Sequence, residues 1–182
     1  PSTITFKRKG KPMPFRDKLL TVDDFIAHWK QLPPSKKLVF TNGVFDLLHL
    51  GHITYLEEAK ALGSHLIVGL NSDESTRNLN KGTSRPIQDE NSRALILAAL
   101  ESVDFVVIFN DSTPLELISR IKPDVLVKGG DYDHNQLDEN QIDFIVGSKE
   151  VKGWGGEVKA LDVLEGYSTT NIEAKIRSNG ED

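Results

Sequence analysis

Short runs of consecutive apolar residues alternate along this chain with stretches in which apolar residues recur every three or four positions. The first pattern predicts strands buried on both faces, and the second predicts amphipathic helices. The predicted strands are 37–41, 65–71, 104–109, 124–128 and 157–161; the predicted helices are one between Thr21 and Pro33, then 51–62, 73–79, 89–100, 114–121, 148–154 and 169–177. This alternation indicates an α/β fold: a Rossmann-like, doubly wound parallel sheet with helices on both faces.

The same pattern divides the chain into three parts. Residues 1–20 are polar, irregular and rich in Lys and Pro, and we expect a loose N-terminal arm. Residues 21–178 are predicted to form a single domain that includes an N-terminal helix, and residues 179–182 a short C-terminal tail. Within the domain, residues 142–146 fit either a strand or a partly buried loop.

Composition indicates a globular protein and limits its chemistry. Hydrophobic residues make up 38% of the 182 residues and charged residues 27%. No apolar run approaches the roughly 20 residues of a membrane span, and the first residues lack a signal-peptide core, so we expect a cytoplasmic protein with no membrane partner. The absence of cysteine excludes thiolate catalysis and Cys-based zinc sites. With a net charge of −5, we expect no nucleic-acid partner, and a polyanionic ligand must be held by a few placed donors.

Two histidines lie three residues apart where the first predicted strand passes into the next helix. A helix N-terminus binds anions because its backbone N–H groups are unpaired and its dipole is positive. His49 and His52 share a helical face and add side-chain donors, while Gly51 lets a phosphate approach the backbone closely. Two unrelated histidines are the alternative, but His-x-Gly-His directly after a strand and an Asn-Gly-Val-Phe-Asp turn favours a phosphate site.

Two more segments follow predicted strands at their carboxyl ends, where such sheets bind ligands. The turn 166–171 opens the last helix, and its hydroxyl and N–H groups are suited to grip a triphosphate from a second side, although an ordinary Ser/Thr cap is the alternative. In the segment 128–131 two glycines permit close backbone approach, and Asp131 is suited to accept hydrogen bonds from sugar or ribose hydroxyls.

The segment 41–52, Thr-Asn-Gly-Val-Phe-Asp-Leu-Leu-His-Leu-Gly-His, resembles the signature of the HxGH cytidylyltransferase-like nucleotidyltransferases. Five further segments, in order and at comparable spacing over about residues 20–178, resemble the D-glycero-β-D-manno-heptose 1-phosphate adenylyltransferases: Asn71-Ser72-Asp73, Ser84-Arg85-Pro86, Lys128-Gly129-Gly130-Asp131-Tyr132, Gly147-Ser148-Lys149-Glu150 and Gly166-Tyr167-Ser168-Thr169-Thr170-Asn171. In the wider family an Arg-Thr pair often precedes the last segment. Here Val163-Leu164 stands there, which argues against glycerol- or choline-phosphate substrates.

The resemblance implies a nucleotidyltransferase that joins a sugar 1-phosphate, D-glycero-β-D-manno-heptose 1-phosphate, to ATP. The products would be ADP-heptose, for lipopolysaccharide or surface glycan synthesis, and pyrophosphate. Mg²⁺ is the expected cofactor, held mainly by the phosphates and water, with Asp46 as a candidate to assist it directly or through water. Because adenylyltransferases of this kind are sometimes fused to a sugar kinase domain, for which this chain has no room, a separate kinase is expected upstream.

The expected site residues fall into three groups. The catalytic residues are His49, His52 and Lys81; the nucleotide-binding residues are Asn42, Gly43, Val44, Phe45, Asp46, Gly51, Arg93, Gly166, Ser168, Thr169 and Thr170; the substrate-binding residues are Arg85, Lys128, Gly130 and Asp131. By spacing, Lys81 and Arg93 match positions at which the family places phosphate-binding cations. The alternatives are a solvated charged loop for Lys81 and an outward, solvent-facing position for Arg93.

The proposed reaction needs no general base, because its nucleophile is a phosphate oxygen that is already ionised at neutral pH. Catalysis then rests on positioning and on charge stabilisation by the placed donors. Two rival functions stay open: a cytidylyl- or guanylyltransferase acting on another alcohol or sugar phosphate, and a non-catalytic nucleotide-binding module. The base, the sugar and its anomer, the role of residues 1–20 and the oligomeric state, including a homo-oligomer, also stay open.

Overall fold

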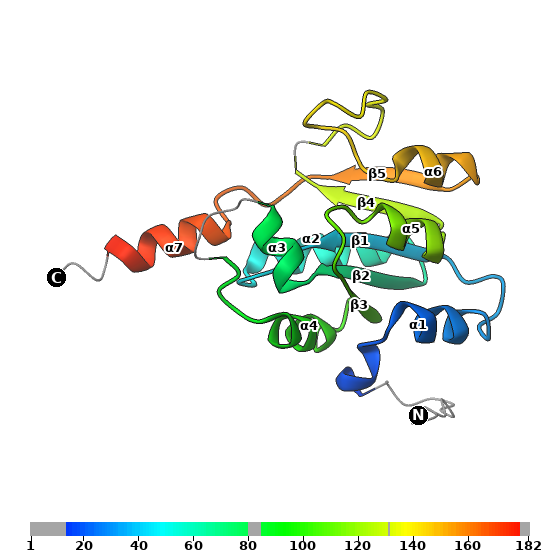
Figure 1. Ribbon diagram of the computed structural model, residues 1–182, viewed down its shortest axis with the longest axis horizontal. Helices are drawn as coiled ribbons and strands as arrows, with labels where there is room; N and C mark the ends of the chain where they lie inside the picture. The colour runs from blue at the N-terminus through cyan, green and yellow to red at the C-terminus, as the bar shows by residue number, and fades with distance from the viewer. Residues whose placement is uncertain (1–13, 80–84, 131, 179–182) are drawn as a thin grey trace.

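The computed structural model describes residues 14–79, 85–130 and 132–178, so the predictions for Lys81 and Asp131 lie outside the described residues. Five parallel strands form one sheet in the order β3-β2-β1-β4-β5 (Figure 1). The strands are β1 (Leu38–Gly43), β2 (His65–Asn71), β3 (Phe105–Phe109), β4 (Val125–Gly129) and β5 (Glu157–Leu161). The predicted Rossmann-like parallel sheet is confirmed.

Helices connect the strands and cover both faces of the sheet. They are a short 3-10 helix (Phe15–Lys18), α1 (Val22–Trp29), α2 (Leu50–Ala61), α3 (Asp73–Asn78), α4 (Glu90–Ala98), α5 (Leu115–Ile121), α6 (Ser148–Gly153) and α7 (Thr169–Ser178). Thr21 and Ser72 cap α1 and α3 as predicted, each accepting a hydrogen bond from a backbone N–H three residues ahead. No helix in these described ranges is long and apolar enough to cross a membrane.

Two hydrophobic clusters, one on each face of the sheet, explain why the strands are continuously apolar. Phe40 packs with Phe25 of α1 and Ile118 of α5 on one face. Its neighbour Val39 packs with Leu56 of α2 on the other face. Successive strand residues point to opposite faces, so a strand covered on both sides is apolar along most of its length, and its polar residues gather toward the carboxyl end.

Residues 14–20 differ from the loose arm that the sequence predicted. Leu19 pairs with Val106 beside β3, and Leu20 is buried in the core. The Lys18 ammonium donates to the carbonyl oxygens of Leu100 and Val103 at 3.0 and 2.7 Å. The prediction of a loose arm is therefore wrong for residues 14–20, because their charged and apolar side chains both contact the rest of the domain.

The ambiguous segment 142–146 is a loop in the structure. Its exposure is uneven, since Ile142 is 98% exposed whereas Ile145 is fully buried under the sheet's helical layer. The buried Ile145 side chain thus packs this loop against the core, and the segment does not form a sixth strand.

The strand order reverses beside β1, because β2 lies on one side of it and β4 on the other. Chains leaving the carboxyl ends of β1 and β4 turn to opposite faces and separate, and this geometry opens a crevice. The predicted phosphate-binding turn follows β1, so the fold places it at this crevice.

Candidate active site

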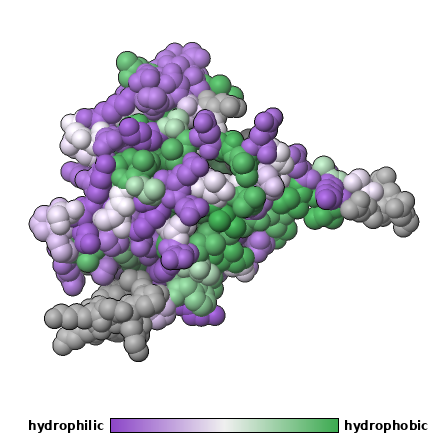
Figure 2. Space-filling model, turned by 180° about the vertical axis from the view of Figure 1, so that it is seen from behind, coloured by the Kyte–Doolittle hydropathy of each residue, from purple (hydrophilic) through white to green (hydrophobic). Residues whose placement is uncertain are grey.

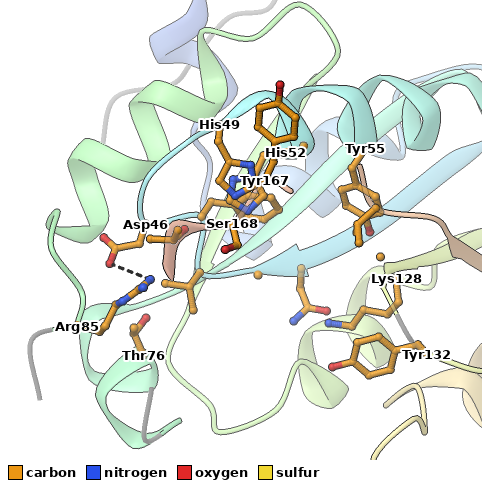
Figure 3. Close-up of a pocket in the computed structure, with 18 residues that line it drawn as sticks. Asp46, His49, His52, Tyr55, Thr76, Arg85, Lys128, Tyr132, Tyr167 and Ser168 are labelled. Carbon is orange, nitrogen blue, oxygen red and sulfur yellow. Dashed lines mark ion pairs between the residues drawn. The ribbon is translucent and has the colours of Figure 1, made fainter. Parts of the chain in front are cut away.

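A cavity of about 350 Å³ opens where the sheet order reverses (Figure 3). It is lined by the carboxyl ends of β1 and β4, the start of α2 and the turn before α7. The lining residues are Asn42, Gly43, Val44, Phe45, Asp46, His49, Gly51, His52, Tyr55, Thr76, Arg85, Lys128, Gly129, Tyr132, Val163, Tyr167, Ser168 and Thr169. Segments that are more than 100 residues apart in the sequence thus meet around one cavity.

The two histidines of the His-x-Gly-His turn stack against each other at the start of α2. Their ring centroids are 3.8 Å apart and the ring planes are inclined by 20°. The Nδ1 atoms of His49 and His52 are both buried and make no hydrogen bond within the described chain, and neither does the Asn42 side-chain oxygen. Buried polar atoms are normally paired, so this concentration beside one cavity marks groups that a ligand would engage.

The environment keeps this imidazole pair neutral. The pKa of His52 is lowered to about 4, mainly by burial and also by the neighbouring His49, while a hydrogen bond with the Leu47 backbone acts in the opposite direction. Burial also lowers the pKa of His49. Near pH 7 each ring therefore carries one N–H donor and no charge. An anion bound beside the rings would raise both pKa values.

The depressed pKa of His52 has a consequence for stability. The unfolded chain binds a proton on this residue below about pH 6.5, whereas the folded chain does so only near pH 4. Stability should therefore fall as the pH decreases from 6.5 to 4, by about 1–2 kcal/mol after allowance for partial solvent exposure. Urea unfolding at pH 7 and pH 5 checks this when wild type is compared with His52→Asn. The variant should show a smaller loss; equal losses in the two proteins would contradict the assignment.

Gly51 lets the turn close over the cavity. A Cβ atom at this position would lie 3.1 Å from His49 Nδ1 and 3.2 Å from the Cβ atom of Tyr167. The absence of a side chain thus allows the start of α2 and the turn before α7 to approach each other. This contact joins the two predicted anion-binding turns across one cavity, as the labelled residues in Figure 3 illustrate.

The loop between β1 and α2 is held in shape by Asp46. Phe45, just before it, has a φ of 47°, which is unusual for a residue other than glycine. The buried Asp46 carboxylate accepts hydrogen bonds from the backbone N–H groups of Ile87 and Gln88 at 2.9 and 3.0 Å, and Arg85 lies 3.8 Å from it. These partners stabilise a loop in which one residue adopts a strained conformation.

The geometry does not fit Asp46 as a direct Mg²⁺ ligand. Both carboxylate oxygens face the loop that precedes α4 and already accept its N–H groups. Among the described residues, no group of three or more His, Asp or Glu side chains is placed to hold a metal ion. Asp46 therefore positions the β1–α2 loop, and these contacts argue against a direct bond to Mg²⁺; the expected contact through water stays a prediction.

Arg93 is also corrected, because it neither faces solvent nor lines the cavity. Its side chain has no exposed surface. The guanidinium donates to the carbonyl oxygens of Val44, Asn71 and Gln88 at 2.7, 2.9 and 3.0 Å and forms an ion pair with Asp73 at 2.7 Å. These protein groups take up four of its five N–H donors, so the structure assigns Arg93 to holding the backbone beneath the cavity instead of contacting phosphate.

The α7 side of the cavity is formed by Ser168 and Thr169, as predicted. Thr169 Oγ1 lies 3.5 Å from the Leu47 carbonyl oxygen, at the edge of hydrogen-bonding range. Gly166 and Thr170, in the same turn, do not line the cavity. Arg85 connects this side to the β1–α2 loop, since it lies near Asp46 and forms a 2.9 Å ion pair with Glu173 of α7.

The β4 side supplies Lys128, whose ammonium lies 5.5 Å from the centre of the Tyr132 ring. Both residues line the cavity. Gly130, expected to contact substrate, is not among the lining residues; it has a φ of 99° and turns the chain after β4. Its neighbour Gly129 lines the cavity in its place.

Several lining residues were not assigned a role from the sequence: Tyr55, Thr76, Tyr132, Val163 and Tyr167. Tyr55 carries the clearest signal, because it lies three residues after His52 and one helical turn further along the same face. Its hydroxyl and that of Thr41 are 2.6 Å apart, and burial raises the pKa of the Tyr55 hydroxyl. Thr76 offers no such signal, since it reaches the cavity only through the packing of α3.

The fold and the cavity together define a class of protein: a Rossmann-like domain that binds a phosphorylated ligand where its sheet order reverses. Uncharged imidazole donors stand at one helix N-terminus, hydroxyl groups stand at another, and Arg85 and Lys128 supply positive charge. A donor set of this kind is suited to stabilising charge on phosphate oxygens. The cytidylyltransferase-like family matches residues 40–175. The chain belongs to this family and is a nucleotidyltransferase.

Two curated relatives show which members of the family this chain is similar to. The bifunctional protein HldE of Methylobacillus flagellatus is 48% identical over 165 residues, which cover 89% of this chain and 32% of that protein. The HldE protein of Pseudomonas putida strain F1 is 50% identical over 161 residues, covering 88% of this chain and 31% of that protein. The chain thus spans about a third of the length of these curated relatives.

Two solved structures share the fold. The lipopolysaccharide core biosynthesis protein from Thermoplasma volcanium has a TM-score of 0.54 and 33% identity, covering 73% of this chain and 99% of that chain. Pantoate-β-alanine ligase from Francisella tularensis, in complex with a form of ATP and β-alanine, has a TM-score of 0.56 and 16% identity, covering 87% of this chain and 76% of that chain. At 16% identity, the similarity to the pantoate-β-alanine ligase shows a shared fold alone.

Proposed function

We propose that this nucleotidyltransferase transfers the adenylyl group of ATP to a sugar 1-phosphate, D-glycero-β-D-manno-heptose 1-phosphate, giving ADP-heptose and pyrophosphate. The observation that carries the proposal is the stacked His49–His52 pair, whose buried Nδ1 atoms lack partners beside a cavity bounded by two helix N-termini. The choice of sugar is supported by the resemblance to heptose 1-phosphate adenylyltransferases and by the identity of about half to HldE proteins.

In this reaction an oxygen of the sugar phosphate attacks the α-phosphorus of ATP, and the bond from that phosphorus to the bridging oxygen of the β-phosphate breaks. The attacking oxygen is already ionised, so no side chain has to remove a proton. The imidazoles of His49 and His52 donate to oxygens of the α- and β-phosphates, on which charge builds up. Ser168 and Thr169 hold the polyphosphate from the α7 side, and Lys128 and Arg85 offset its charge. Lys81, outside the described residues, is proposed as a further phosphate-binding cation.

Mg²⁺ is part of the proposal as a partner of the triphosphate. When bound, it would offset the charge on the triphosphate, with water and phosphate oxygens as its ligands. The protein's own task is then to receive the triphosphate, which the donors on both sides of the cavity do without a carboxylate cage.

The expected pathway context belongs to the same proposal. We propose that a kinase acting on a sugar phosphate or sugar prepares the sugar 1-phosphate in an earlier step. The ADP-heptose product would serve lipopolysaccharide or surface glycan synthesis in the cytoplasm.

A pyrophosphate-release assay over a panel of nucleotides and acceptors tests this function. ATP, CTP and GTP are each combined with D-glycero-β-D-manno-heptose 1-phosphate, its α-anomer, glucose 1-phosphate and glycerol 3-phosphate. ATP with the β-heptose phosphate should give the highest kcat/KM, by at least about 100-fold over CTP and GTP, because a site that hydrogen-bonds one base leaves polar groups unpaired with another. Higher rates with CTP or GTP would mean that the enzyme transfers a cytidylyl or guanylyl group instead of an adenylyl group. Tight ATP binding without pyrophosphate release from any pair would support the non-catalytic alternative.

A further inference from the structure

Arg85 lines the cavity, and its hydrogen-bond donors are hardly used by the protein. Its side chain is 12% exposed and forms ion pairs with Asp46 and Glu173, but within the described residues its guanidinium donates no hydrogen bond. Arg93, in contrast, donates to four protein acceptors. A largely enclosed guanidinium with unused N–H groups beside a cavity is suited to binding an anionic ligand.

Two carboxylates flank Arg85 and cancel its charge. Its Nη2 atom lies 2.9 Å from Oε1 of Glu173, and its Nη1 atom lies 3.8 Å from Oδ2 of Asp46, the contact drawn as a dashed line in Figure 3. One guanidinium and two carboxylates leave one negative charge in excess. A phosphate group at the same place would add further negative charge, and like charges repel. One carboxylate must therefore withdraw before Arg85 can offset the charge of a phosphate.

Asp46 is held in place and cannot be the carboxylate that withdraws. Its side chain is buried, and its oxygens accept hydrogen bonds from the backbone N–H groups of Ile87 and Gln88 at 2.9 and 3.0 Å. Moving this carboxylate would leave those N–H groups without their acceptor and would release the β1–α2 loop. Glu173 is the remaining candidate.

Glu173 lies on a helix with little to hold it. No residue of α7 is buried, and its hydrogen bonds to preceding segments lie at its start, at Thr169 and Asn171. Figures 1 and 2 show the helix extending beyond the body of the molecule. The Oε1 atom of Glu173 is buried, yet its contact with Arg85 lacks hydrogen-bond geometry. A side chain on such a helix can move at small cost, because few packed contacts are lost.

We propose that Glu173 is the counter-ion of Arg85 in the empty site and that it releases the guanidinium to a phosphate group when the ligand binds. Glu173 thereby competes with the ligand and lowers its affinity, and it recaptures Arg85 when the product leaves. Because Glu173 does not line the cavity, it acts through Arg85 as a positioning residue. The inference rests on the proposed function in one respect, that this cavity receives the phosphates.

Isothermal titration of the whole chain with pyrophosphate, and separately with ATP, tests the exchange. Glu173→Gln keeps the size of the side chain and removes its charge. It should lower the Kd for pyrophosphate by about 5–10-fold, because the ligand no longer has to displace an ion pair. A purely structural role predicts the reverse, since a loosened α7 would weaken binding. No gain in affinity for either probe would overturn the proposal.

Glu101→Gln is the matched control for the loss of one negative charge. Glu101 is exposed in the segment before β3, at the edge of the sheet opposite to the cavity. Its replacement should leave the Kd for pyrophosphate unchanged. A gain equal to that of Glu173→Gln would mean that the net charge of the chain sets the affinity, and would contradict the proposal.

A double-mutant cycle shows whether Glu173 acts through Arg85. In the Arg85→Gln background no guanidinium is left to exchange, so adding Glu173→Gln should change the Kd for pyrophosphate by less than about 2-fold. A gain as large as in the wild-type background would mean that Glu173 repels the ligand directly, which rules out the exchange. Pyrophosphate is released whichever base and sugar the enzyme uses, so these results do not depend on the adenylyl or heptose assignment.

Discussion

His52→Ala is expected to lower kcat for pyrophosphate release by about 10²–10³-fold, with a much smaller change in KM for ATP. The imidazole is the deeper member of the stacked pair, and its unpartnered Nδ1 atom lies beside the cavity. Negative charge on the α- and β-phosphate oxygens grows as the bond from the α-phosphorus to the bridging oxygen breaks. A donor beside these oxygens therefore stabilises the transition state more than it stabilises bound ATP. Steady-state kinetics with saturating sugar 1-phosphate measures both constants.

Two further variants test whether the effect comes from hydrogen-bond donation by His52 and whether it is specific to the cavity. His52→Asn keeps a side-chain N–H group without the ring and should recover part of the lost kcat. His134→Ala removes an exposed histidine from the 132–146 loop, outside the cavity lining, and should leave the kinetics unchanged. Near-normal turnover in His52→Ala would remove the role assigned to this residue. A raised KM with unchanged kcat would mean that His52 binds ATP and the transition state equally well.

The place of the His-x-Gly-His turn in the cavity was predictable because its signal is local. His49, Gly51 and His52 lie within one helical turn, and a strand-to-helix junction is recognisable from the apolar pattern alone. Lys128, Ser168 and Thr169 were predictable for a different reason: the carboxyl ends of parallel strands meet at one edge, so segments that follow strands converge there. These three residues line the same cavity as the histidines.

Residues whose role depends on tertiary burial were not predictable in the same way. In the sequence, Arg93 is a cation on an amphipathic helix, and nothing nearby shows that the carbonyl groups of Val44 and Asn71, from two distant segments, converge on it. Asp46 likewise looks like a free carboxylate beside a phosphate site, although its partners lie about 40 residues further along the chain. The expectation of a loose arm was wrong at residues 14–20 for a similar reason, since Lys18 is held by carbonyls of the α4–β3 connection.

The contacts of Arg93 tie together the segments that carry the site. Its guanidinium connects Val44, which lines the cavity, to the end of β2 at Asn71, to the loop before α4 at Gln88, and to Asp73 at the start of α3. A planar cation with five donors suits this task better than lysine, whose single ammonium cannot reach several carbonyls in one plane. The residue thus sets the position of the β1–α2 loop without touching the ligand itself.

Arg93→Met should lower the free energy of unfolding by about 3–5 kcal/mol, because it fills a similar volume but leaves the Val44 and Asn71 carbonyls buried without donors and Asp73 without its cation. Urea unfolding measures the change, and Arg77→Met, at an exposed arginine on α3, should cost less than about 0.5 kcal/mol. Arg93→Lys should fall between the two. An Arg93→Met variant with wild-type stability and reduced ATP affinity would contradict this prediction. The guanidinium would then contact the phosphates, and the positioning role derived from its four protein contacts would be wrong.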